Sequence, residues 1–309
     1  MTKSKKVDLV LGLIIIFLSI LALPKIILKN QGKNIKSLET ALLNKKYLEK
    51  INSIYIGDSV DTLHFQKKGE IWLCIYGDLV FFADNNLVSQ MLTNFSKTRN
   101  LLQISNRAEN LSQYGLAEGE AFNISFFQED LAGNKNEFSS IFFGIENSDR
   151  TRIYLKTNRK NTVYSMENDL YQYFNTRLET FGLMELIPIQ DSKSESLVES
   201  IEIVDFSKDN FKTIKKIGDE DFSDLVHRLF SLRGATLFQE DILASDNMKL
   251  LKSITAKTSK NTFYNIEIYS YTNSISGVQY FVKTNFSDKD SSVNYVMEIS
   301  SWTKSRLDF

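Results

Sequence analysis

Two histidines and one cysteine supply the only imidazole and thiol groups of this 309-residue chain. His64 stands in an alternating, strand-like segment, and His227 in a segment with helical spacing. Neither has partners at zinc spacing, so we expect no metal site. Cys74 lies among strand-forming residues, which favours a small buried hydrophobe over a reactive thiol. A lone cysteine allows no intramolecular disulfide.

Sequence motifs that identify enzyme classes are also missing. The chain has neither a Gly-x-Ser-x-Gly elbow nor a glycine-rich phosphate loop. A Ser/His/Asp triad stays open, because its members need not be neighbours in sequence. We predict no catalytic, cofactor-binding or metal-binding residues.

Carboxylates gather at Asp219-Glu220-Asp221 and at Glu240-Asp241. One interpretation is cation binding or acid–base chemistry. The other is a helix cap by Asp219 or Asp221 and solvated loop charge at Glu240-Asp241, and we favour it. Calcium-loop spacing is absent from both groups.

Charge and composition restrict the partners. The formal net charge is −1, and acidic and basic residues are mixed along the chain. Without a basic stripe to hold a phosphate backbone, we expect no nucleic-acid partner. The hydrophobic fraction of 42% is that of a globular protein.

The N-terminus reads as a membrane anchor. Lys3, Lys5 and Lys6 precede the uncharged run 9–23, and the apolar character continues to Leu28. About 20 such residues cross a bilayer. A cleaved signal peptide is the alternative, but the run lacks a small-x-small cut site. We expect residues 1–30 to be a cytoplasmic tip and single-pass signal-anchor in the cytoplasmic membrane, with the rest extracytoplasmic.

Four short matches recur in the same order along the chain, which predicts a tandem duplication. They are Ser53-Ile54-Tyr55-Ile56 with Ser200-Ile201-Glu202-Ile203, Phe122-Asn123-Ile124 with Tyr264-Asn265-Ile266, 154–158 with 281–285, and 177–179 with 306–308. We expect a stalk over 31–50, one copy over 51–190 and a second over 191–309, joined by a polar stretch at 191–196.

The expected fold class is α+β, with each copy an antiparallel sheet carrying helices on one face. Apolar residues at i, i+3, i+4 and i+7 predict helices that contain 88–95 and 222–229, with a further helix at 168–179 and a short one at 300–307. Strands are expected at 51–56, 60–66, 70–76, 79–83, 122–127, 138–143, 152–156, 162–166, 197–204, 211–217, 264–269, 278–283 and 293–299.

Adjacent aromatic residues occur at Phe81-Phe82, Phe126-Phe127 and Phe142-Phe143. In a strand, one member of each pair faces the core and the other faces away. The outward member is either covered by a helix of the other copy, which we favour, or part of an exposed binding patch.

Residues 111–116, Leu-Ser-Gln-Tyr-Gly-Leu, resemble the signature of domain-of-unknown-function family 4340. A tryptophan strand at 70–73, strands like 152–155 and 162–166, and the N-terminal membrane helix resemble the same family. Members usually have a proline shortly after the signature, where this chain has Ala117-Glu118-Gly119-Glu120. The resemblance implies no catalytic residues.

The family resemblance implies a periplasmic accessory role beside ABC-type transport systems of the gliding-motility kind. We therefore expect a non-catalytic, membrane-anchored accessory or binding protein, with a transporter permease or auxiliary subunit as its partner. The alternative is an extracytoplasmic hydrolase or ligand-binding enzyme subunit, which would show a cleft with His64 or His227 beside a polar partner.

Overall fold

The structure is a computed structural model that describes residues 36–158, 160–187, 197–208, 211–260, 262–273, 277–287 and 292–308. The expected anchor at 1–30 and the polar stretch at 191–196 lie outside the described residues. Within the described ranges, no helix has both the length and the apolar character needed to span a bilayer.

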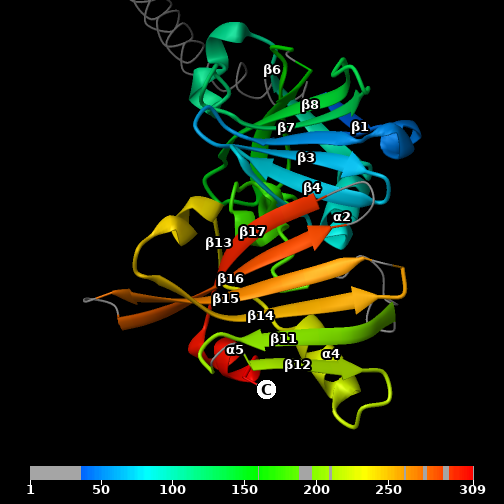
Figure 1. Cartoon of the computed structure of the whole chain (residues 1–309). Helices are drawn as coiled ribbons and strands as arrows, with labels where there is room; N and C mark the ends of the chain where they lie inside the picture. Colours follow the sequence, from blue (N-terminus) through cyan, green and yellow to red (C-terminus); the bar gives the residue numbers. More distant parts are fainter. Residues whose placement is uncertain are drawn as a thin grey trace, which may run out of the picture. The chain divides into compact units, whose positions relative to one another are not determined.

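Two antiparallel sheets with few helices dominate the described residues, in agreement with an α+β or mostly β class (Figure 1). Ten strands form the first sheet, in the order β1-β6-β10-β9-β8-β7-β2-β3-β4-β5. Seven strands form the second, in the order β12-β11-β14-β15-β16-β17-β13. The chain's compact units divide the first sheet within β8: residues 1–42, 97–121 and 141–169 belong to one unit, and 43–96, 122–140 and 170–309 to the other.

The ten-stranded sheet and the helices of its part of the chain have the following bounds: β1 Ser37–Ala41, η2 Lys45–Lys50, β2 Ser53–Gly57, β3 Thr62–Lys68, β4 Ile71–Tyr76, β5 Leu79–Phe82, α2 Asn85–Phe95, β6 Thr98–Ser105, η3 Ala108–Asn110, η4 Ser112–Tyr114, β7 Phe122–Glu129, β8 Lys135–Glu146, β9 Arg152–Thr157, β10 Val163–Glu167, η5 Tyr171–Tyr173 and α3 Leu178–Phe181.

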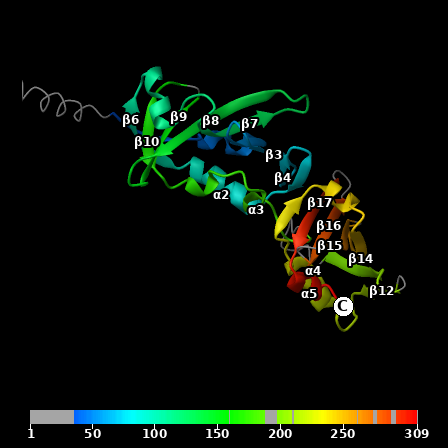
Figure 2. The ribbon, with the colours of Figure 1, turned by 90° about the vertical axis from the view of Figure 1, so that its left-hand side faces the viewer.

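The seven-stranded sheet and its helices follow: β11 Val198–Asp205, β12 Phe211–Lys216, α4 Phe222–Ser231, β13 Thr236–Phe238, η7 Glu240–Ala244, β14 Met248–Thr258, β15 Phe263–Asn273, β16 Gly277–Ser287, β17 Ser292–Ile299 and α5 Ser301–Arg306. Figure 2 shows α4 and α5 together beside this sheet.

The two sheets share an order of strands. Seven neighbouring strands of the first sheet, β3-β2-β7-β8-β9-β10-β6, follow one another along the chain as β12-β11-β14-β15-β16-β17-β13 do in the second. In both, a helix follows the first hairpin, the next strand goes to the far edge, and a four-strand meander fills the space between. The first sheet adds β1 at one edge and the hairpin β4–β5 at the other.

The amphipathic helices form as their spacing predicts. Val88, Met91 and Phe95 of α2 are buried, as are Leu225 and Leu229 of α4. These residues lie at i, i+3, i+4 and i+7 positions, so one face of each helix is apolar and packs inward.

Three predicted features differ from the structure. The described part of the stalk, 36–50, contains strand β1 and the 3-10 helix η2, because β1 pairs with β6 through residues 98–102. The helix expected at 168–179 is a single 3-10 turn at Tyr171–Tyr173 followed by the short α3. Strands β13 and β14 were not expected, and they place the match 264–266 on β15, which does not correspond to β7 in strand order.

Candidate functional site

His64 lies in a small polar cluster on β3. Its Nε2 is 3.0 Å from Ser53 Oγ and 3.9 Å from Glu129 Oε2, and its ring stacks on Tyr55 with centroids 4.2 Å apart. A catalytic triad needs the nucleophile and the acid on opposite ring nitrogens. Here both partners face the same nitrogen, and Ser53 is fully buried. The cluster therefore does not have the geometry of a triad.

The surroundings of His64 lower the pKa of its imidazole. Burial lowers the pKa of this imidazole, Glu129 opposes that change, and Lys135 adds to it. The histidine is thus held toward its neutral form, as a buried imidazole usually is.

His227 and Cys74 lie on different elements and differ in exposure. His227 is an exposed residue of α4. Cys74 is buried on β4, and its burial raises the pKa of the thiol, which keeps it protonated. No group of three His, Cys, Asp or Glu side chains in the described part of the chain could hold a metal ion.

We predicted that Asp219 or Asp221 caps a helix. The structure places Asp221 at the cap position of α4 but gives its carboxylate another partner. Asp221 is the N-cap residue of α4, but its side chain makes no capping hydrogen bond. Lys215 Nζ donates to both of its oxygens instead, at 2.8 and 3.0 Å. Asp219 accepts a hydrogen bond from the amide of Lys216 at 2.8 Å. The carboxylates therefore organise the turn between β12 and α4. Asp241, of the second group, is an exposed residue of η7.

Each aromatic pair has a member in contact with other side chains, and for two of the pairs these partners lie on strands. Phe82 packs edge-on against Phe286 of β16, with centroids 5.4 Å apart. Phe127 packs edge-on against Tyr55 at 5.5 Å. Phe142 belongs to a small apolar cluster around the sequence signature.

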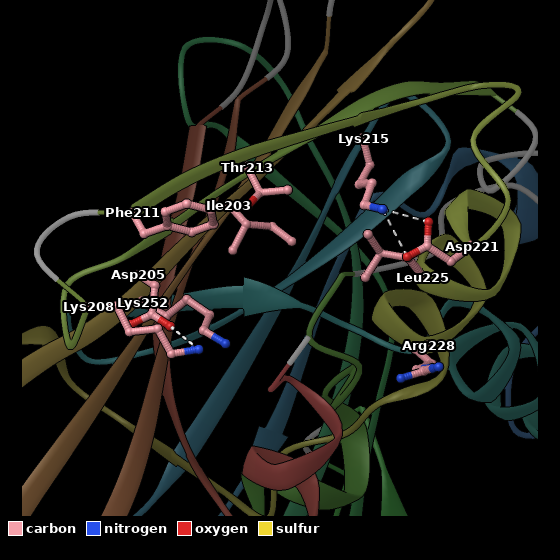
Figure 3. Close-up of a pocket in the computed structure, with 10 residues that line it drawn as sticks. All are labelled: Ile203, Asp205, Lys208, Phe211, Thr213, Lys215, Asp221, Leu225, Arg228 and Lys252. Carbon is pink, nitrogen blue, oxygen red and sulfur yellow. Dashed lines mark hydrogen bonds and ion pairs between the residues drawn. The ribbon is translucent and has the colours of Figure 1, made fainter.

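A cavity of about 380 Å³ lies between the seven-stranded sheet and α4. Figure 3 shows its walls, in which β11 and β12 face α4 and β14 contributes one residue. The lining residues are Ile203, Asp205, Lys208, Phe211, Thr213, Lys215, Asp221, Leu225, Arg228 and Lys252. We call this the α4 pocket.

The lining of the α4 pocket has four basic and two acidic side chains. Asp224 and Asp308 add acidic partners for Arg228 and Lys252. Lys252 is only 5% exposed, and its Nζ donates to Leu307 O at 2.9 Å and lies 3.3 Å from Asp308 Oδ1. A lysine this deep needs partners, because burying an unpaired charge is costly. The C-terminal segment after α5 supplies them.

The other charges of the α4 pocket are paired near its rim. The Lys215–Asp221 pair raises the pKa of the lysine and lowers that of the aspartate. Lys208 lies 3.6 Å from Asp205, whose pKa is lowered chiefly by the hydrogen bond from the Ser207 hydroxyl. Rim pairs of this kind are weak and exchangeable. They leave the pocket able to accept an anionic group.

The matching place in the ten-stranded sheet is filled. Ile54 of β2 faces Phe65 across the strand pair, and Ile201 of β11 faces Lys215. Phe65 is fully buried and packs edge-on against Phe181 at 5.3 Å. At this one position of the register, the first sheet has a core aromatic and the second has a pocket lysine.

Sequence reasoning missed the α4 pocket. One signal was present: the residues of β12 that face α4 include Thr213 and Lys215, where a core strand would carry apolar side chains. The alternation on this strand lacks an apolar face, which indicates a strand that does not close a core.

The signature at 111–116 has a structural role. Gly115 ends η4 with φ of 65°, and a Cβ there would lie 2.9 Å from Ile145 Cγ2. Leu116 is fully buried, and Lys156 Nζ donates to its carbonyl at 2.8 Å. Burial lowers the pKa of Lys156. The motif therefore fastens two 3-10 turns onto the sheet. In place of the usual proline, the chain forms a turn closed by Glu120 N donating to Ala117 O at 3.2 Å.

The two-sheet fold and the signature geometry define a family rather than an activity. Residues 75–272 match the domain of unknown function DUF4340, and the chain belongs to this family. The match covers more than half of the chain and confirms the resemblance found in the sequence. No curated protein matches the chain. No solved structure matches it either.

Proposed function

We propose that this chain is a non-catalytic, membrane-anchored accessory protein on the outer side of the cytoplasmic membrane, attached to an ABC-type transport system, and that the α4 pocket binds an anionic group of its ligand or partner. The α4 pocket carries this proposal. It is the place where a charged cavity of useful size replaces packed aromatic residues, and it gathers four cations around two carboxylates.

A tandem duplication explains the second half of the chain. The shared order of seven strands supports it, and so does the register. Lys156 on β9 faces Phe142 of the preceding strand, and Lys283 on β16 faces Glu267 of the preceding strand. These two lysines thus lie on strands that correspond in the two sheet orders. After duplication, the first copy kept a closed core, and the second was free to develop a pocket.

Extracytoplasmic location rests on the sequence of the first 30 residues. Fusions of alkaline phosphatase after Asn30 should be active, because Lys3, Lys5 and Lys6 hold the N-terminus in the cytoplasm. An inactive phosphatase fusion together with an active cytoplasmic reporter at the same site would reverse the orientation.

A binding role fits the polar clusters better than hydrolysis does. The alternative enzyme hypothesis asked for a histidine beside a polar partner in a cleft, and His64 has such partners. The hydroxyl of Ser53 is nevertheless buried, so a substrate has no access to it. The α4 pocket has cations and an aromatic wall but no histidine.

Quantitative affinity purification tests the proposal. The full-length chain, expressed at native level and solubilised in mild detergent, should retain ABC permease or ATPase subunits. Lys208→Glu with Arg228→Glu reverses two charges of the pocket wall and should reduce that recovery strongly. Lys249→Glu with Lys257→Glu makes the same charge change on β14 outside the pocket and should not.

Two outcomes would count against this proposal. Equal recovery of transporter subunits with the pocket variant and with its control would show that the α4 pocket does not bind the partner. Absence of transporter subunits from every preparation, with the chain intact and folded, would show that the chain is not attached to such a transporter.

A further inference from the structure

The seven-stranded sheet has an uncovered edge at β12. This strand is outermost in the sheet and leads through a short turn directly into α4 (Figure 1). In the ten-stranded sheet, β3 takes the matching place, but there β4 pairs along its outer side. A bare strand edge displays unpaired N–H and C=O groups and accepts further strands. Among the described residues, no strand of the second sheet takes the place that β4 takes in the first.

One hydrogen bond at the end of β12 shows which of its backbone N–H and C=O groups point away from β11. Ile217 N donates to Glu199 O at 3.2 Å, so this residue bonds toward β11. Residues alternate in an antiparallel pair, so Lys212, Ile214 and Lys216 direct their N–H and C=O groups outward.

Asp219 already satisfies the last of these residues. Its Oδ2 accepts from Lys216 N at 2.8 Å, and its own N–H donates to Lys216 O at 3.1 Å. Among the described residues, this leaves the outward backbone groups of Lys212 and Ile214 as the open part of the edge.

The surroundings of these groups have room for a chain. A cavity of about 550 Å³ is lined by Thr213, Ile214 and Lys215 of this strand and by residues 219–221 of the turn that follows it. Ile214 is 49% exposed and Phe211 62% exposed. An edge that only had to avoid pairing would carry charge without large apolar side chains.

We propose that an extended segment of a partner protein adds to β12 as an antiparallel strand, in the place that β4 takes beside β3. It carries acidic side chains opposite the lysines of β12 and an apolar side chain opposite Ile214. Main-chain hydrogen bonds to Lys212 and Ile214 hold it, and the cross-strand side chains select it.

Charge argues for a different protein as the occupant. β12 has the sequence Phe-Lys-Thr-Ile-Lys-Lys, with three lysines and no acid. Opposite charges in directly facing positions stabilise a strand pair, and like charges destabilise it. A second copy paired antiparallel about Ile214 would place Lys212 opposite Lys216, so self-pairing is disfavoured.

The test uses the full-length chain in nanodiscs and a fluorescent peptide containing Glu-Glu-Val-Thr-Glu, which in antiparallel register places glutamates opposite Lys216, Lys215 and Lys212 and valine opposite Ile214. We expect saturable binding by anisotropy, and no binding of the matching peptide with Lys-Lys-Val-Thr-Lys. Ile214→Pro removes the outward N–H that the added strand needs, at an edge position where proline is tolerated. It should weaken binding at least about tenfold, or ~1.4 kcal/mol. Ile214→Thr keeps the N–H and should retain most of the binding.

A second measurement does not depend on the proline variant folding. Peptides N-methylated along one edge should fail to bind wild type, while peptides methylated along the opposite edge should still bind. Methylation that has no effect on either edge would overturn the strand addition.

Other results also decide the matter. Absence of binding would show that the lysines only guard the edge. Dimers in solution that Ile214→Pro abolishes would make a second copy the occupant. The inference goes beyond the α4 pocket: Lys208→Glu with Arg228→Glu should leave peptide binding intact, and loss of binding in that variant would place the peptide in the pocket instead.

Discussion

The two sheets follow one plan and use the space beside their helices in opposite ways. Beside α2, the first sheet is closed by packed aromatic residues such as Phe65 and Phe95, which are fully buried. Beside α4, the second sheet leaves a charged cavity, and Lys215 stands in the position of Phe65. The comparison teaches that strand order can be kept while the inner side chains decide whether a region is core or binding site.

The helix starts show the same contrast. Asp84 caps α2 by accepting from the amides of Asn86 at 2.8 Å and Leu87 at 3.1 Å. Asp221 takes the cap position of α4, but its carboxylate binds Lys215. Asp84 therefore stabilises the start of α2, whereas Asp221 forms an ion pair at the rim of the α4 pocket.

The largest expected effect is the difference in unfolding free energy between a core variant at Phe65 and a pocket variant at Lys215. Phe65→Ala should lower the free energy of unfolding by about 3–5 kcal/mol, because it leaves a cavity among buried aromatics. Lys215→Ala should cost less than about 1 kcal/mol, because it removes only a partly exposed ion pair. Denaturant unfolding of the two variants checks this. Equal losses would mean that β12 is as closely packed as β3.

The helix caps should give a smaller difference in the same direction. Asp84→Ala removes two capping hydrogen bonds and should cost about 1 kcal/mol. Asp221→Ala should cost only a few tenths, because no capping bond is lost. Thermal melts of both variants measure the difference, with Asp84→Asn as a control that keeps the cap. A larger loss at Asp221 would contradict the assignment of its carboxylate to the pocket rim.

Much of the fold could be predicted where a pattern is local. Alternation marked β2, β3 and β9, and the i, i+3, i+4, i+7 spacing marked α2 and α4. Strand β14 was missed because lysine and small hydroxyl residues interrupt its apolar face. The helix expected at 168–179 was wrong in its backbone. Leu170 and Tyr173 are buried as their spacing predicts, but they reach the core from around a single 3-10 turn.

The α4 pocket could not be predicted in the same way. Its charged residues come from β11 and the turn after it, from β12, from β14 and from α4 with its N-cap residue, and they meet through the register of the strands. Lys252 illustrates the limit. Its sequence neighbours indicate a surface lysine, and its burial depends on Leu307, 55 positions further along the chain.

The smallest expected effect concerns pH and His64, which has no counterpart in the second sheet, where Ile214 faces Glu202 as His64 faces Tyr55. Burial lowers the pKa of His64 below its ordinary value near 6.5. As pH falls below about 6.5, the unfolded chain binds a proton there before the folded chain does. The folded state should therefore lose stability through this group between that pH and the lower pKa of the folded state.

His64→Gln should remove this component. Free energies of unfolding at pH 7.5 and pH 5.5, measured for wild type and variant, should show a smaller acid-side loss in the variant. His227→Gln changes an exposed imidazole of α4 and serves as the control. The double variant His64→Gln with His227→Gln should still complement a deletion strain, because neither imidazole lines the α4 pocket. If the double variant melts like wild type but fails to complement, the Ser53–His64–Glu129 cluster becomes the functional centre, and the accessory role should be abandoned for an enzymatic one.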